Sequence, residues 1–486
     1  MFIRTVKSRS STCFQIGYKR QKRFVLVKHV GCASKEAEIE VLKIKAKEEL
    51  IRVSEQLFLF PESNTPFKAK QVSWKITGYH QVFGRVYDSI GFPNNLLRDL
   101  TIARIVFPHS KLATVRFLSR CCGIKLSKDK IYRFLGQVDK EELTKIAYSY
   151  VTRKNKNIVS LVFYDVTTLY FETEREDDLR RKGFSKDHRA DVPQVLVGLF
   201  VDIDGYPFDF DFFSGNTFEG DTFPVAIKRL MNKYQLKDLV VVADAGMLSI
   251  KNLGYLESIG LGYVVGARLK NLNNEIKTKV LSHNFMTKNL TQFDIANRRL
   301  IVDYSEERDK KDKHNRERII KKLQAKIDKK QTLITKSKYL LLEKEGKVIG
   351  VDLVKIDEDK RYDGLKGYFT NLTKRVNPQI IISQYHNLWK VEKAFRMSKS
   401  DLQTRPVYHH NSDKVKAHLV LCFVSLLVMK VTERLLAKKN ISLTHAIELL
   451  STVGQGKTKI GNMIVETESE VDQKTKSLLE INKLGY

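Results

Sequence analysis

The sequence is poor in cysteine, with only five among its 486 residues. No two of them form a Cys-x-x-Cys pair and their number is odd, so neither a zinc knuckle nor a disulfide framework is predicted. Reduced thiols, as in a cytosolic protein, are therefore expected. The five are Cys13, Cys32, Cys121, Cys122 and Cys422.

Long apolar runs are also missing. The longest, HLVLCFVSLLVM at 418–429, is too short to cross a bilayer and is typical of a buried helix. The first twenty residues contain no apolar stretch of the kind found in secretory signal peptides. These absences predict a soluble, intracellular protein with no membrane partner.

Acidic residues are outnumbered by basic ones. The 86 Lys and Arg residues against 56 Asp and Glu residues give a formal net charge of +30 at pH 7. Such a surplus favours a polyanionic partner, because a basic protein that binds nucleic acid releases condensed counterions. A basic protein without such a partner is the alternative.

Changes in periodicity divide the chain into five parts. The chain opens with a basic segment that contains a short hairpin around Lys19–Lys22, followed by a charged helix at 34–57. Helices of helix-turn-helix size come next. They favour DNA contact, although short helices of this kind are also a common packing module. A solvated helix is predicted within 305–331. The predicted parts are a basic, mainly helical DNA-binding region (1–153), the first part of an α/β core (154–270), a β-rich insertion (271–375), the second part of the core (376–436) and a helical appendix (437–486).

Two strand-like segments each lead into an aspartate. Asp165 follows LVFY, and Asp244 follows VVVA. A buried strand seldom contains an unpaired carboxylate, and acids at strand ends of an α/β sheet gather where ligands bind. Two neighbouring carboxylates need a cation, and oxygen ligands of this kind select Mg²⁺ or Mn²⁺. A turn former or helix cap is the alternative for either aspartate. Asp211 and Glu219 are not predicted as ligands.

A third group comes from a helix predicted at 379–400. Tyr385, Glu392 and Lys399 are spaced by seven residues, so they project from one face about 10 Å apart. Glu392 suits a metal ion there, and Tyr385 and Lys399 suit a phosphate. An exposed helix with an incidental repeat is the alternative.

Taken together, these residues resemble the DDE transposases of bacterial insertion sequences. The resemblance is to the insertion-sequence-four type, whose signature is Y-(2)-R-(3)-E-(6)-K, and it covers about 80–435. It includes FDFDFFSGNTFEGDTF, DAGMLSIKNLGYLESIGLGYVVGARLK and RYDGLKGYFTNL. The signature arginine is Leu388 here, so its phosphate contact is expected from a neighbour: Lys390, Lys393 or Arg396.

The resemblance implies an RNase H-like catalytic core, interrupted by the insertion, in which Asp165, Asp244 and Glu392 hold two divalent ions. It implies that water nicks the end of the element and that the freed 3′-OH attacks another strand, in a cut-and-paste reaction. The implied partners are terminal inverted repeats, target double-stranded DNA and a second copy of the chain, on the nucleoid of a bacterial cytoplasm. A catalytically silent DNA-binding descendant and a structure-selective nuclease are the alternatives. The three acids favour an enzyme, and the N-terminal region and insertion favour a transposase.

Overall fold

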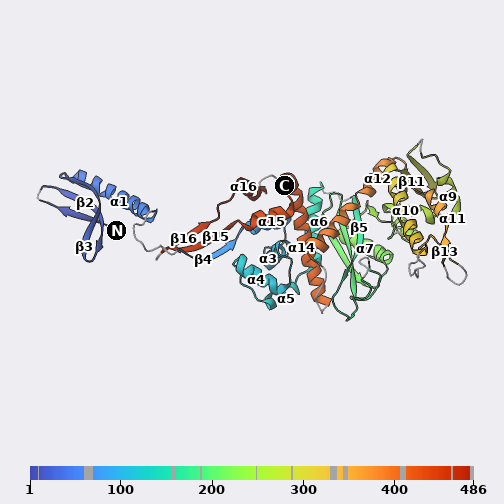
Figure 1. Ribbon diagram of the computed structural model, residues 1–486, viewed down its shortest axis with the longest axis horizontal. Coiled ribbons are helices and arrows are strands. Elements are labelled where there is room, and N and C mark those ends of the chain that lie inside the picture. The colour runs from blue at the N-terminus through green and yellow to red at the C-terminus, as the bar shows by residue number, and fades with distance from the viewer. Residues whose placement is uncertain are drawn as a thin grey trace. The chain divides into compact units, whose positions relative to one another are not determined.

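A computed structural model describes the chain except for 11 short segments (9, 60–68, 156–159, 186–188, 248, 286–287, 329–336, 343–347, 405–411, 461–462 and 482–486). The described residues fall into two compact units (Figure 1). Unit 1 comprises Met1–Val72 and Lys457–Glu466, and unit 2 comprises Ser73–Gly456 and Thr467–Tyr486. None of the helices in these described ranges is both long and apolar enough to span a membrane.

Unit 1 contains a three-stranded antiparallel sheet and a long helix. The sheet order is β1 (Phe2–Lys7), β2 (Thr12–Arg20) and β3 (Arg23–Ala33), and α1 (Glu36–Leu59) packs on it. The predicted hairpin is present, and its two turn residues, Gln21 and Lys22, have φ angles of 48° and 65°. Phe14 and Ile16 form the buried face of β2, next to Ala46 and Val53 of α1.

Cys13 and Cys32 form a disulfide in this sheet. The prediction of five reduced thiols is therefore wrong for this pair. The register of β2 and β3 places the two residues directly opposite each other. Their separation of 19 residues in sequence conceals this pairing, because it depends on the strand register and not on a cysteine motif. Cys121, Cys122 and Cys422 are free thiols.

A second small sheet joins distant parts of the chain. It has the order β16 (Met463–Glu468), β15 (Gly454–Ile460) and β4 (Ala69–Ile76). The sequence predicts only helices after residue 436, and this is wrong: the two strands lie between α15 (Leu443–Ser451) and α16 (Gln473–Leu479). β16 is largely exposed and β15 is mostly partly exposed, and neither shows the apolar alternation that predicts strands.

Unit 2 is a mixed α/β structure built on an eight-stranded mixed sheet. Its strand order is β10-β11-β14-β9-β8-β5-β6-β7. β5 pairs in parallel with β8, and β8 pairs in parallel with β9, whereas all other neighbours are antiparallel. The bounds are β5 (Leu161–Tyr170), β6 (Gln194–Asp202), β7 (Pro207–Ser214), β8 (Val240–Ala243), β9 (Gly262–Ala267), β10 (Leu290–Ile295), β11 (Arg298–Tyr304) and β14 (Leu365–Thr370).

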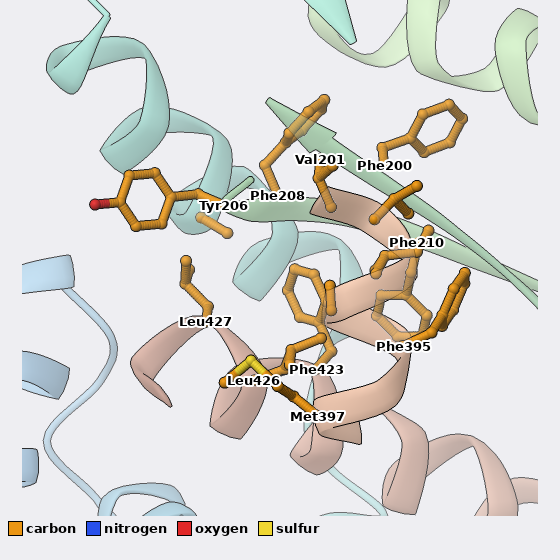
Figure 2. Packing of buried hydrophobic residues seen from close by; sticks show 14 of the residues in the cluster. Phe200, Val201, Tyr206, Phe208, Phe210, Phe395, Met397, Phe423, Leu426 and Leu427 are labelled. Atoms are coloured by element: carbon orange, nitrogen blue, oxygen red, sulfur yellow. The ribbon is translucent and has the colours of Figure 1, made fainter. Parts of the chain in front are cut away.

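Helices cover this sheet. α14 (Ser412–Ala437) is buried along most of its length, as the apolar run at 418–429 predicts, and contacts both β7 and helix α3. Phe423 of α14 stacks on Phe210 of β7 with ring centroids 4.8 Å apart (Figure 2). The other helices are η1 (His80–Gly84), α2 (Arg85–Ile90), α3 (Leu96–Val106), α4 (Lys111–Cys121), α5 (Lys128–Leu135), α6 (Lys140–Lys154), α7 (Glu219–Tyr234), α8 (Ile250–Ser258), α12 (Pro378–His386), α13 (Trp389–Arg396) and η3 (Met397–Asp401).

Residues 271–375 are not simply β-rich. Their strands β10, β11 and β14 extend the large sheet beyond β9, and β12 (Leu340–Leu342) pairs separately with β13 (Val348–Val351). Between them lie α9 (Asn274–Leu281), the 23-residue α10 (Glu306–Asp328) and α11 (Leu353–Lys360). The predicted charged helix is α10. The segment is therefore mixed α/β, and part of it completes the sheet.

Candidate active site

Asp165 of β5 and Asp244, which directly follows β8, lie next to each other where these two parallel strands pair. β5 and β8 pair with Tyr164 opposite Ala243, so the residues that follow, Asp165 and Asp244, occupy neighbouring positions. Adjacent strands are about 4.8 Å apart, which brings the two carboxylates into one cluster. Asp165 is not at a strand end as predicted, because β5 continues to Tyr170 beside β6.

The acids are more accessible than the sequence predicts. Asp165 is half-buried, and Asp244 and Glu392 are exposed, although the neighbours of Asp165 on β5 are buried. The reason is that β8 ends at Ala243, and the chain turns away after it. The acids thus lie at a solvent-accessible edge of the apolar core, where a ligand can reach them.

Tyr385 is bonded directly to one of these acids. Its hydroxyl donates a hydrogen bond of 3.0 Å to Oδ1 of Asp244. Burial raises the pKa of Tyr385, and the carboxylates of Asp244 and Glu392 raise it further, so the phenol remains a donor at neutral pH. Gly266 makes room for this contact, because a Cβ there would lie 2.5 Å from the Tyr385 oxygen. Tyr385 therefore fixes the position of Asp244.

Lys366 of β14 is a basic residue of the same cluster that the sequence does not single out. Its Nζ lies 4.7 Å from the centroid of the Tyr385 ring. Burial lowers the pKa of Lys366, and the nearby carboxylates of Asp244 and Glu392 oppose that shift. Lys366 thus places a positive charge near two of the three acids.

Arg268 is a second basic residue near Asp244. A Cβ on Gly246 would lie 3.7 Å from both the Arg268 guanidinium and Oδ2 of Asp244. Both basic residues lie in segments that carry the family resemblance, Lys366 in RYDGLKGYFTNL and Arg268 in GYVVGARLK. Membership of those segments is the only sequence signal for them.

The helix predicted at 379–400 is divided into three elements. α12 ends at His386, α13 begins at Trp389, and residues 397–401 form the π-helix η3. Tyr385, Glu392 and Lys399 therefore belong to successive elements and do not form one regular stripe. The π-helical turn changes the direction of side chains that a seven-residue repeat assumes.

Lys399 is half-buried and lines a small cavity beside β5. Thr167 and Leu169 line the same cavity. Because side chains alternate along a strand, these two residues share a face of β5 with Asp165. Lys399 thus lies on the same side of the sheet as Asp165.

The donor set fits a divalent cation. Asp165 and Asp244 follow paired positions of β5 and β8, and Glu392 in the first turn of α13 lies near Tyr385. Oxygen donors of this kind suit Mg²⁺ or Mn²⁺. Across the described ranges, no three His, Cys, Asp or Glu side chains already stand close enough to enclose a metal ion.

Comparison with known proteins decides the family. Residues 160–428, more than half of the chain, match the family model described as a transposase DDE domain. The chain belongs to the DDE transposase family. Asp165, Asp244 and Glu392 all lie within the matched range. No protein of curated function is a significant sequence match to this DDE transposase.

Two solved structures of transposases are distantly similar to this DDE transposase. The piggyBac transposase synaptic complex with hairpin DNA, determined by cryo-EM, is 10% identical, with 84% of this chain and 79% of that chain covered and a TM-score of 0.40. The Mos1 transposase paired-end complex with left transposon end is also 10% identical. In that case 36% of this chain and 60% of that chain are covered, with a TM-score of 0.16.

The residues predicted to replace the signature arginine differ in their contacts. Lys390 donates a hydrogen bond to the carbonyl oxygen of Ile203, and Lys393 forms an ion pair of 2.7 Å with Glu433. Arg396 is exposed and has no hydrogen-bond or ion-pair partner among the described residues. Of these three candidates in the DDE transposase, Arg396 is the most available for a ligand.

Leu388, at the signature position, is buried with 6% of its surface exposed. It belongs to the main hydrophobic core of this DDE transposase. The side chain at position 388 therefore packs in the core, and the position is not a surface site from which a phosphate-binding side chain is missing.

A separate acidic cluster in this DDE transposase is structural. Asp209 is fully buried and accepts hydrogen bonds from Arg229 at 2.8 Å and from Tyr234 at 2.7 Å. Asp211 pairs with Arg229 at 2.6 Å and with Lys140 at 3.0 Å. These contacts use the carboxylate oxygens that a metal ion would need.

Proposed function

We propose that the chain is a DNA transposase that cleaves the ends of an insertion sequence and joins them to target DNA. The observation that carries this proposal is the neighbouring position of Asp165 on β5 and Asp244 directly after β8, within the range matched by the family model. Cleavage by water followed by attack of the freed 3′-OH is the proposed reaction, in a cut-and-paste pathway. A dimer holding two ends, acting on nucleoid DNA, is part of the proposal.

An RNase H-like core is the proposed architecture of the catalytic part. The strand order β7-β6-β5-β8-β9 supports it, with an antiparallel β7-β6-β5 group followed by parallel β8 and β9. β5 carries Asp165, Asp244 directly follows β8, and α13 supplies Glu392. The residues from 271 to 375 are then an insertion between the second and third acids.

The chain's own residues have separate roles in this proposal. Asp165, Asp244 and Glu392 would hold divalent ions, which when bound would activate the attacking oxygen and stabilise the leaving one. Tyr385 orients Asp244 through its hydrogen bond. Lys366 adds positive charge next to the acids, where a phosphodiester would lie.

Basic side chains farther from the acids would hold the DNA strand. Arg396 is exposed on α13, and Lys399 lies on the Asp165 side of β5. Lys390 and Lys393, which already contact protein groups, would do so only after giving up those contacts.

A nicking assay tests the proposed function. The substrate is a duplex that carries the DNA flanking the element end, incubated with the full chain and Mg²⁺ or EDTA. We expect a metal-dependent 3′-OH at the element boundary, abolished by Asp244→Asn and retained by Asp294→Asn, which changes an exposed acid of β10. Binding without cleavage by the unaltered chain, on a verified end, would instead support the catalytically silent alternative.

A further inference from the structure

The sheet of unit 1 has one covered face and one open face. α1 packs against the face that carries Phe14 and Ile16. Because side chains alternate along β2, Cys13, Gln15, Gly17 and Lys19 point to the opposite face. None of the described elements of unit 1 covers that second face, which is called the open face below.

An arginine of the edge strand β1 is held in place on the open face. The Phe24 ring lies over Gly17, where a Cβ would come within 2.5 Å of it. Phe2 meets this ring edge-on with centroids 5.6 Å apart, and the Arg4 guanidinium lies 4.8 Å from its centroid. Arg4 is exposed and has no hydrogen-bond or ion-pair partner among the described residues. Stacking therefore orders the guanidinium while its donors remain available.

Other hydrogen-bonding side chains surround Arg4. Gln15 is opposite Arg4 in the β1–β2 register, and His29 is opposite Gln15 in the β2–β3 register. Lys19 is opposite Phe24 and exposed. The turn beyond it adds Arg20, Lys22 and Arg23, all exposed. The open face thus combines a group of hydrogen-bonding side chains, Arg4, Gln15 and His29, with a basic tip formed by the residues around the β2–β3 turn.

The charge of this segment is entirely of one sign. Residues 1–35 contain nine Lys and Arg residues and no Asp or Glu. The complementary partner is therefore a polyanion. The segment also lies outside residues 160–428, so the match to the transposase domain does not account for it.

We propose that the open face binds double-stranded DNA in the major groove. The major groove admits a β-ribbon, and there arginine pairs with guanine and glutamine with adenine. Arg4 and Gln15 then face the bases, while Lys19 and the basic tip contact phosphates. Phe24 lies between Gly17 and Arg4, so its ring does not offer a platform on which a single-stranded base would stack. The identity of the duplex as an element end rests on the proposed function.

Binding by the full chain tests this assignment. Fluorescence anisotropy in EDTA, which prevents cleavage, compares the element-end duplex with one of its single strands. We expect Arg4→Ala and Gln15→Ala each to weaken duplex binding about tenfold. The control Arg52→Ala removes the same group from an exposed position on α1, and we expect little change. Methylation of guanine N7, an atom in the major groove, should interfere with binding of the unaltered chain and not of Arg4→Ala.

The outcomes separate this proposal from the proposed function. Duplex binding unaffected by Arg4→Ala and Gln15→Ala, an equal loss with Arg52→Ala, or tighter binding of the single strand overturns the major-groove assignment. Lys19→Ala, at an exposed position, gives an independent test if a central variant fails to fold: an unchanged affinity counts against the open face. A chain that cuts no DNA but loses duplex affinity through Arg4→Ala supports the open face and contradicts only the proposed catalysis.

Discussion

Tyr385 donates a hydrogen bond to Asp244 from 141 residues farther along the chain. This bond links α12 to the turn after β8, and both partners lie close to the charge of Lys366. The candidate active site is therefore held together by contacts between the part of the chain before residue 271 and the part after residue 364. Its geometry depends on their correct assembly.

Removing the Tyr385 hydroxyl tests whether it positions Asp244. Tyr385→Phe is expected to lower the single-turnover cleavage rate roughly 10- to 100-fold, as expected for loss of a hydrogen bond to a charged group. DNA affinity in EDTA should not change. Tyr368→Phe is the matched control, because it removes a neighbouring hydroxyl that contacts His386 instead. Equal rates for Tyr385→Phe and the unaltered chain would show that Asp244 needs no such support.

A substitution at Gly266 is a second test of the hydrogen bond between Tyr385 and Asp244. A Cβ at this position would meet the Tyr385 oxygen, so Gly266→Ala should displace the phenol and reproduce the rate loss of Tyr385→Phe. The double variant should lose no more than either single one, since both changes break one bond. Gly254→Ala is the control, because nothing lies within 4 Å of a Cβ there. Additive losses in the double variant would contradict this coupling.

Replacing Lys366 should change the metal requirement. Lys366→Met removes a positive charge near Asp244 and Glu392, so we expect half-maximal cleavage at a Mg²⁺ concentration about three- to tenfold lower. The maximal rate should fall if Lys366 also contacts the scissile phosphate. Titration of cleavage with Mg²⁺ measures both quantities, with Lys374→Met, an exposed lysine paired with Asp294, as control. A higher Mg²⁺ requirement would contradict electrostatic competition at the acids.

The buried network around Asp209 should dominate the stability of unit 2. Arg229→Met leaves the fully buried Asp209 without its guanidinium partner, and we expect the free energy of unfolding to fall by about 3 kcal/mol. Urea unfolding followed by fluorescence measures this loss. The control Lys279→Met breaks an exposed pair with Glu275 and should leave the unfolding free energy unchanged within error. Equal effects of both variants would rule out a special role for the network.

Asp202 should make stability depend on pH. Burial raises the pKa of Asp202 to about 6, above the value of about 3.9 expected in the unfolded chain. Its contribution is therefore fully present below about pH 4 and is lost as pH rises through about 6, amounting to roughly 3 kcal/mol. Asp202→Asn should remove this slope from the unfolding free energy, while the control Asp294→Asn, at an exposed position of β10, should keep it. A slope that persists in Asp202→Asn would assign the titration to another group.

The sequence predicts the strands that lead into Asp165 and Asp244, because β-branched and aromatic runs identify β5 and β8. The interpretation of Asp165 as the end of the strand is wrong, because Val166, Thr167 and Thr168 also favour a strand and β5 continues to Tyr170. The interruption between α12 and α13 is also concealed. Asn387 and Leu388 keep helical φ angles and carry no proline or glycine that would signal a break.

Contacts between strands that are distant in the sequence are the main structural feature that hydrophobic periodicity cannot predict. Lys366 reaches the acids because β14 joins the sheet beside β9, and Cys13 meets Cys32 because of the β2–β3 register. β15 and β16 are not predicted for a different reason: their partly or fully exposed side chains show no apolar alternation. Pairing register and exposure are tertiary properties, so a local pattern contains little information about them.

The extension of the large sheet by β14, β11 and β10 has a consequence for deletion variants of this protein. β9 is a short apolar strand whose Tyr263, Val264 and Val265 are almost fully buried, and β14 hydrogen-bonds along its outer side. Deleting the residues between the second and third acids would leave that side as an unpaired sheet edge. Such an edge is a template for association with other chains. The shortened protein would therefore aggregate, and its catalytic activity could not be compared with that of the full chain.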